Sequence, residues 1–139
     1  IAPAYVPLMN IILSIQRVHL IKNNERKAYR RVMTASEIAD YEDYRGIFKW
    51  HAAKDEHLVS MDKSVMLSSI SERVGQTRKD LVDEIGRRKE VLHWMRERNI
   101  RSYKDVAAII AEYCARPKQI YEKVLAGEEV KVVAVARNP

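Results

Sequence analysis

Three arginines in the first third of the chain have the residue type and the spacing to bind an anion. Arg17 lies in one predicted strand, and Arg30 and Arg31 are adjacent in the next. Guanidinium groups bind phosphate and carboxylate oxygens through two parallel hydrogen bonds. The arginines are therefore candidate phosphate contacts. The alternative is that they form internal ion pairs with Glu37, which follows in the same strand, and with carboxylates near it.

A second pattern, over residues 63–90, is that of a helix-turn-helix. Gly75 separates two predicted helices, and the second begins with the sequence TRKDLVDEI, in which two basic residues precede three carboxylates. Basic residues at that position contact DNA phosphates in helix-turn-helix proteins, whereas the carboxylates would repel them. This pattern therefore supports one possible function, that of a free-standing nucleic-acid-binding domain, which is the alternative to the function that the family resemblance below implies.

Other residue types give no catalytic or metal-binding site. The four glycines do not form a P-loop or a dinucleotide fingerprint, so the chain has no nucleotide cradle of its own. Of the histidines, only His51 and His57 could meet, across a predicted hairpin, and single histidines on strands are more often surface residues. Cys114 is the one cysteine, which excludes an internal disulfide, and we expect it to be a small core residue.

The composition is that of one globular domain. The chain has 139 residues and a formal net charge of +6, with acidic residues among the basic ones, as is typical of solvated faces. Its longest apolar run, at residues 11–15, is far below the roughly 20 residues of a bilayer helix. The single cysteine and the lack of a signal peptide favour the cytoplasm. Because the chain begins at Ile1, we expect it to be processed or part of a longer protein.

The elements that position the arginines are predicted strands. Residues 11–21 and 27–40 are rich in β-branched residues and alternate in polarity, and Asn23-Asn24 between them predicts a turn, hence an antiparallel pair. Residues 47–50 and 57–61 predict a second hairpin. From residue 62 the pattern is helical. The chain is therefore predicted to be α+β, with antiparallel strands in the N-terminal half and a four-helix array after them.

Four helices are predicted, over residues 64–74, 76–99, 102–115 and 117–126. The long second helix has an apolar stripe that we expect to be buried: Leu81, Ile85, Leu92 and Met95, widened by Val82, Val91 and Trp94. The third helix is predicted to begin with a Ser102 and Asp105 capping pair and to bury Val106, Ile109, Ile110 and Tyr113. The predicted domains are 1–61, 62–127 and a tail, 128–139, whose segment VKVVAVA at 130–136 is a possible strand.

Four stretches of the chain resemble a known family. They are VPLMNIILSIQRV, AYRRVMTASEIADY, GIFKWHAAKDEH and EIGRRKEVLHWMRERNIRSYKDVAAIIAEYCARPKQIYEKV. From Pro3 to Leu125 the sequence resembles the C-terminal end of the archaeal type II/IV secretion ATPases, the motors of archaella and archaeal pili. The most specific part is a basic helix ending in Trp-Met, then a capped Ile-Ile helix and a Tyr before Arg-Pro. Cys114 stands where this pattern has an aromatic residue.

The resemblance implies a RecA-like hexameric motor that holds ATP between subunits, with ATP and Mg²⁺ as cofactors of the parent protein. The P-loop, the acidic Mg²⁺ box and the histidine box would lie upstream of Ile1. This chain is then expected to be non-catalytic and inactive alone, completing the motor sheet and providing subunit contacts and coupling. Arg17, Arg30, Arg31 and Glu37 would lie near phosphate or a subunit interface. The implied partners are the rest of the motor, neighbouring subunits and a membrane platform protein. Through these partners the chain would lie in the cytoplasm at the inner face of the cell membrane. No direct binding to nucleic acid is expected from the resemblance.

Overall fold

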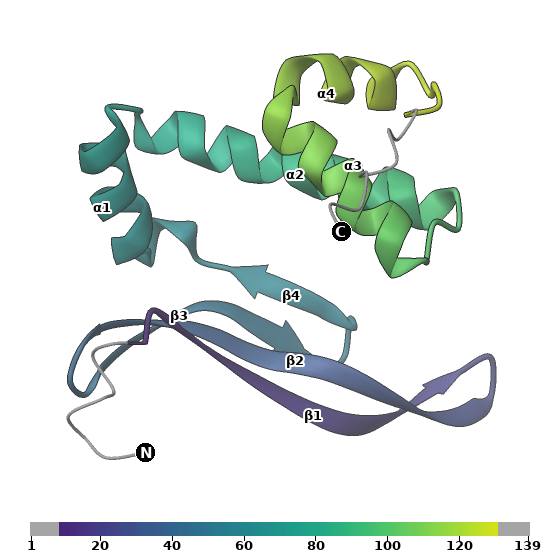
Figure 1. The fold of residues 1–139 in the computed structure, drawn as a ribbon. Coiled ribbons are helices and arrows are strands. Elements are labelled where there is room, and N and C mark those ends of the chain that lie inside the picture. Colours follow the sequence, from purple (N-terminus) through teal and green to yellow (C-terminus); the bar gives the residue numbers. More distant parts are fainter. Residues whose placement is uncertain (1–8, 131–139) are drawn as a thin grey trace, which may run out of the picture. The chain divides into compact units, whose positions relative to one another are not determined.

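A computed structural model describes residues 9–130 of the chain, and within them it confirms the predicted α+β class. A four-stranded antiparallel sheet is followed by four α-helices (Figure 1). The chain divides into two compact units, which we call the first unit (Ile1–Arg78) and the second unit (Lys79–Pro139). This division lies after the predicted boundary at residue 61, because the first helix is bonded to the sheet.

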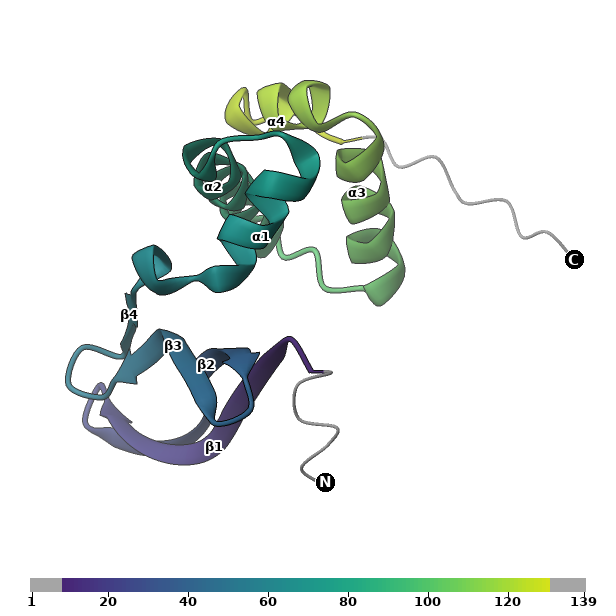
Figure 2. The ribbon, with the colours of Figure 1, turned by 90° about the vertical axis from the view of Figure 1, so that its left-hand side faces the viewer.

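The sheet is a meander in which each strand is antiparallel to the next. Its strands, in spatial order, are β1 (Ile11–Lys22), β2 (Glu25–Asp40), β3 (Asp43–His51) and β4 (Glu56–Val59). The predicted turn is confirmed at Asn23 and Asn24, whose φ angles of 52° and 60° are left-handed. Asparagine tolerates this conformation better than most residues, and a two-residue turn of this kind matches the right-handed twist of the strands that it joins. Figure 2 shows how strongly the β1–β2 hairpin curls.

One irregularity in the sheet changes which side chains share a face. The register between β1 and β2 shifts from the pair Ser14 and Thr34 to the pair Ile15 and Val32, which leaves Met33 as an extra residue. Such a bulge interrupts the strict alternation of side chains along a strand. Positions on β2 before and after Met33 therefore cannot be assigned to a face by counting residues in twos.

The first helix of the chain packs with the sheet in the first unit. A short 3₁₀ helix, η2 (Met61–Lys63), leads to α1 (Val65–Val74). Ser64 is the N-cap of α1, and its hydroxyl accepts a hydrogen bond from the Leu67 amide at 3.0 Å. Gly75 ends the helix with φ of 65°, the left-handed conformation typical of a helix C-terminus. The predicted end of this helix is thus confirmed.

The second unit is built from three helices (Figure 2), and their buried side chains form one apolar core. They are α2 (Arg78–Glu97), whose first residue belongs to the first unit, α3 (Tyr103–Ala115) and α4 (Pro117–Leu125). Their buried residues are Val91, Trp94, Met95, Ile109, Tyr113, Ile120 and Val124, joined by Val130. The core therefore takes only the C-terminal half of α2, which is where α3 and α4 supply partners.

Several predictions about buried faces were wrong. On α2, Leu92 is 54% exposed, and Val82 and Ile85 are also exposed. On α3, Ile110 is 45% exposed and Cys114 is exposed rather than buried. The physical reason is that the core buries only part of the apolar surface of each helix, so the apolar residues beside that part stay exposed. The predicted capping bond of Ser102 is also not formed among the described residues.

The possible strand at 130–136 lies outside the described residues except for Val130, which is buried. Between residues 9 and 130, none of the helices combines the length and the apolar character needed to cross a bilayer.

Candidate functional site

The candidate site is built on the β1–β2 hairpin, and it brings together two of the three predicted arginines. Arg17 and Arg30 are directly opposite each other in the register, so their side chains share one face of the ladder. Arg31 pairs with Gln16 and follows Arg30, so its side chain leaves the opposite face. Arg17 and Arg30 are both exposed, whereas Arg31 is half-buried.

The face that carries Arg17 and Arg30 has no carboxylate over this part of the ladder. Its register pairs are Ile15 with Val32, Arg17 with Arg30, His19 with Ala28, and Ile21 with Arg26. The carboxylate of this region, Glu25, pairs with Lys22 on the other face. Like charges directly opposite each other are destabilising unless an anion meets them. We call the residues of these four pairs the cationic face.

Most of the net charge of the protein is in this hairpin. Six arginines and lysines lie between residues 15 and 34, and Glu25 is the one carboxylate among them, so this segment has a formal charge of +5. The whole chain has a net charge of +6. A surface with one sign of charge raises the local concentration of anions and their rate of association. The interleaving of charges predicted for the whole chain is therefore absent from this segment.

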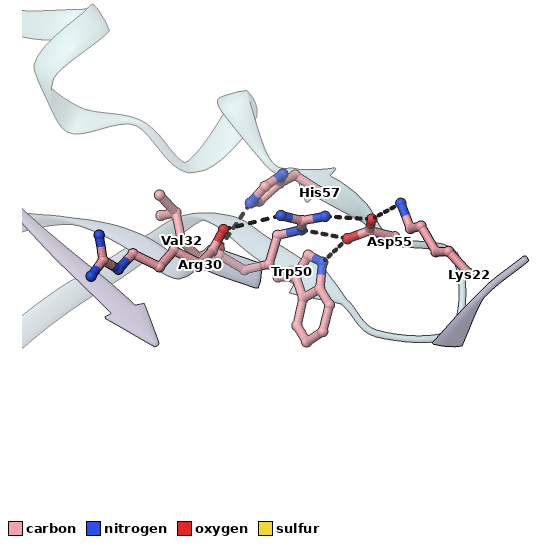
Figure 3. Close-up of polar contacts among 7 residues, drawn as sticks. Lys22, Arg30, Val32, Trp50, Asp55 and His57 are labelled. Carbon is pink, nitrogen blue, oxygen red and sulfur yellow. Dashed lines mark hydrogen bonds and ion pairs between the residues drawn. The ribbon is translucent and has the colours of Figure 1, made fainter. Parts of the chain in front are cut away.

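Arg31 binds a carboxylate of the same chain, that of Asp55, at the turn between β3 and β4 (Figure 3). The guanidinium Nε donates to Asp55 Oδ1 at 2.6 Å, and the terminal NH2 group donates to Oδ2 at 2.7 Å. Lys22 Nζ, at the far end of β1, also contacts Oδ2 at 2.7 Å. These hydrogen bonds, that of Arg31 first, hold the pKa of the Asp55 carboxyl well below its usual range. The hydrogen bonds between Arg31 and Asp55 also raise the pKa of the Arg31 guanidinium.

Two aromatic residues complete this network. Trp50 Nε1 donates to Asp55 Oδ1 at 3.0 Å, and the Arg31 guanidinium lies 4.9 Å from the centre of the Tyr29 ring. Figure 3 shows the Arg30 side chain pointing away from Asp55. The cluster therefore uses Arg31 to fix the β3–β4 turn against the hairpin, and it leaves Arg30 to the cationic face.

Glu37 is not a partner of the arginines, contrary to the alternative considered from the sequence. It is 7% exposed and binds the first turn of α1. Ser64 Oγ donates to its Oε1 at 2.5 Å, and the amides of Val65 and Met66 donate to its Oε2 at 2.8 and 3.0 Å. A carboxylate at a helix N-terminus accepts amides that lack partners within the helix. Glu37 is therefore a structural cap, separated from Arg31 by the bulge at Met33.

The two basic residues at the start of α2, where the predicted helix-turn-helix would contact DNA, are engaged within the protein. Arg78 donates to the backbone oxygens of Asp62 and Ser64, each at 2.9 Å, and also contacts the Met61 oxygen. Lys79 forms an ion pair with Asp83 at 2.9 Å. Cations that are already bonded gain little from phosphate, so these contacts argue against DNA binding at the start of α2.

Asp55 is the member of the site region that the sequence analysis missed. Its position in the sequence KDE, between two predicted strands, indicated only a turn. Its bond to Arg31 could not be predicted from local sequence, because the two residues are 24 positions apart. Its left-handed φ of 52° was not predicted either. Within residues 9–130 no group of three or more His, Cys, Asp or Glu side chains is placed to hold a metal ion. The chemistry that this arrangement can perform is the binding of an anion at Arg17 and Arg30.

Comparison with known proteins gives one family. Residues 55–136, more than half of the chain, match the family described as PilB3-like, C-terminal. The match begins at Asp55 and includes the helices α1 to α4, whereas Arg17 and Arg30 precede it. No curated protein matches the chain.

Proposed function

This chain belongs to the PilB3-like, C-terminal family, the C-terminal region of a pilus or secretion ATPase, and we propose that it is the non-catalytic part of that motor. In this proposal it completes the motor sheet, contacts neighbouring subunits and couples them to ATP hydrolysis. ATP and Mg²⁺ bind a P-loop region outside this chain, because the 139 residues contain no phosphate-binding loop. The motor is RecA-like, hexameric and archaeal, and it drives a pilus, an archaellum or secretion.

The observation that carries the proposal is the apolar edge strand β1. It lies at one edge of the described sheet, and none of its residues is buried. Several of its large apolar side chains are exposed: Ile11 by 52%, Leu13 by 56%, Ile15 by 59% and Ile21 by 76%. An apolar edge strand pairs readily with another strand, and proteins usually cover such an edge. A sheet that continues into the rest of the motor would cover it.

The cationic face has a second role in the proposal. Arg17 and Arg30 contact an anion from outside the chain, either a nucleotide phosphate or the acidic surface of a neighbouring subunit. An arginine supplied across a subunit boundary stabilises the charge that develops during phosphoryl transfer. Arg31 and Glu37 have internal partners, and the proposal assigns them to the scaffold. The further partner is a membrane platform protein, which holds the motor at the cytoplasmic face of the membrane.

The edge strand is tested by the variants Leu13→Lys and Ile15→Lys in the parent ATPase and in this chain. Both residues are more than half exposed, so the melting temperature of the chain alone should change by less than about 2 °C. The parent should lose assembly and ATP turnover. Leu58→Lys is the matched control, because Leu58 is also 56% exposed but lies on β4, at the opposite edge. Normal assembly of the Leu13 and Ile15 variants would refute sheet completion.

The arginines are tested separately by Arg17→Ala and Arg30→Ala. Turnover of the parent ATPase should fall tenfold or more, and the melting temperature of the isolated chain should stay the same. Lys27→Ala is the control, since Lys27 belongs to the same hairpin but lies on the opposite face and is ion-paired with Glu25. Unchanged turnover would refute the contact with an external anion. A large loss of stability in the isolated chain, with turnover intact per folded enzyme, would show that the arginine pair is scaffold.

A further inference from the structure

The second unit contains an apolar groove between α2 and α3. A cavity of about 170 Å³ opens there, lined by Arg88, Val91, Leu92, Met95, Ile110, Tyr113 and Cys114. Leu92 and Ile110 stand at its mouth with about half of their surface exposed, and Cys114 is exposed beside them. We call these lining residues the α2–α3 groove. It has the apolar walls and the room to accept a side chain from outside.

Positive charges predominate on the α2 side of the groove. On a helix surface the neighbours of a residue are three and four positions away. The charged neighbours of Leu92 are Arg88, Lys89 and Arg96, and each is a cation. The corresponding neighbours of Ile110 on α3 are uncharged, namely Val106, Ala107, Tyr113 and Cys114. The groove therefore has an apolar floor with a cationic rim on the α2 side.

This positive rim is only partly neutralised by the chain itself. Glu84 accepts from Arg88 Nε at 2.8 Å and from the Tyr113 hydroxyl at 3.2 Å, but it also pairs with Arg87. One carboxylate thus serves two guanidinium groups. Lys89 and Arg96 are exposed and form no ion pair with any residue between 9 and 130. Donors therefore remain available for carboxylates from another molecule.

We propose that the α2–α3 groove binds an acidic amphipathic helix of another protein. Its apolar side chains are spaced at i, i+3 or i+4 and i+7; one enters the cavity and the others lie along the exposed surfaces of Leu92 and Ile110. Its flanking Asp and Glu side chains meet Arg88, Lys89 and Arg96. A helix laid into an apolar groove between two helices is a common mode of recognition, and charge at the rim selects the partner and its direction. The flexible, polarizable Met95 in the floor lets the groove adapt to the inserted side chain.

The charges distinguish this occupant from two others. A second copy bound through the same groove would form a two-fold interface, in which the cations of one groove face those of the other. The C-terminal segment of the chain, KVVAVARNP after Val130, has apolar residues but two cations and no acidic side chain. An acidic helix is the occupant that satisfies both the apolar floor and the rim.

The probe is a fluorescent 16-residue peptide with leucines at i, i+4, i+7 and i+11 and glutamates on both flanks. Its matched partner has a lysine in place of each glutamate. Fluorescence anisotropy with the 139-residue chain should give saturable binding of the acidic peptide, weakened by salt, and at least tenfold weaker binding of the lysine peptide. Equal binding of the two peptides, or no binding of either, would overturn the proposal.

Variants locate the binding. Leu92→Asp and Ile110→Asp should each weaken the acidic peptide at least tenfold. Leu125→Asp is the matched control, because Leu125 is 66% exposed on α4 and does not line the groove, and it should have no effect. The double variant K89E/R96E should lose the acidic peptide and gain the lysine peptide, whereas K104E should change neither. Circular dichroism shows whether each variant is folded.

Two outcomes would replace the proposed occupant by another. If the chain forms a dimer that Leu92→Asp abolishes, the groove is an interface between copies. If Val132→Asp and Val133→Asp together strengthen binding of both peptides, the C-terminal segment of the chain competes for the groove. A Leu92→Asp variant that is folded and binds the acidic peptide normally would exclude the groove altogether.

Discussion

The carboxylate of Glu37 accepts a hydrogen bond from Ser64 Oγ at 2.5 Å and joins β2 to the first turn of α1. Ser64 in turn accepts from the Leu67 amide, so one chain of hydrogen bonds runs from the sheet into the helix. Both residues are buried, at 7% and 3% exposed. Buried hydrogen bonds of this kind are costly to break because their donors cannot turn to water.

We therefore expect Glu37→Ala to lower the free energy of unfolding by about 1–3 kcal/mol, because three donors at the start of α1 lose their acceptor. Ser64→Ala should cost about 0.5–2 kcal/mol, as is usual for the loss of an N-cap. Urea denaturation followed by circular dichroism measures both. Glu72→Ala, at an exposed position of α1, is the control and should stay within about 0.5 kcal/mol of the wild type.

The Arg31 and Asp55 pair should make stability depend on pH in the acidic range. The pKa of the Asp55 carboxyl is depressed in the folded state, so the pair stabilises the fold above the unfolded pKa of about 3.9. That stabilisation is lost as the pH falls below this value toward the folded pKa. The wild type should melt above Asp55→Asn at pH 7, and the difference should shrink between about pH 4 and pH 2. A difference that is the same at both ends of this range would contradict the ion pair; Asp62→Asn, at an exposed position, serves as the control.

Adjacent isoleucines on α3 should respond very differently to truncation. Ile109 is 2% exposed and belongs to the core, so Ile109→Ala should cost about 2–5 kcal/mol. Ile110 is 45% exposed, and Ile110→Ala should cost less than about 1 kcal/mol. Trp94→Ala, at a residue 7% exposed, should cost about 3–5 kcal/mol. Denaturant midpoints for the three variants decide the matter, and equal losses at Ile109 and Ile110 would mean that the core is placed wrongly.

The chain alone should not hydrolyse ATP. Catalysis of phosphoryl transfer requires groups that hold the phosphates and the metal ion, and this sequence has no P-loop to supply them. Phosphate release from purified protein should equal that of a buffer blank and of an equally purified Trp94→Ala sample. Turnover that rises in proportion to the concentration of this chain and survives further purification would refute the prediction.

Local signals were enough to predict the elements of the fold. The Asn23-Asn24 turn, the glycine after α1 and the change from alternating to helical periodicity each act within a few residues. The order of the elements and the α+β class follow from such signals. The opposition of Arg17 and Arg30 was also predictable in outline, because a two-residue turn fixes the register of the strands that it joins.

Contacts between distant residues could not be predicted in the same way. The bulge at Met33 has no sequence signature, and counting along β2 in twos would put Arg31 and Glu37 on one face, although they bind different partners. On α2, Leu92 and Val91 fit the apolar stripe equally well, and only the positions of α3 and α4 decide that Val91 is buried. Periodicity identifies an amphipathic helix, but the extent of its buried face depends on what packs against it.

The two tryptophans of the chain are divided one to each unit, which gives each unit its own intrinsic fluorophore. In the first unit, Trp50 donates a hydrogen bond to the Asp55 carboxylate. In the second unit, the Arg98 guanidinium lies 4.9 Å from the centre of the Trp94 ring. In a Trp50→Phe variant, tryptophan emission therefore reports only on the helical core. Comparing its unfolding curve with the circular dichroism of the whole chain would show whether the two units melt as a single cooperative block or one after the other.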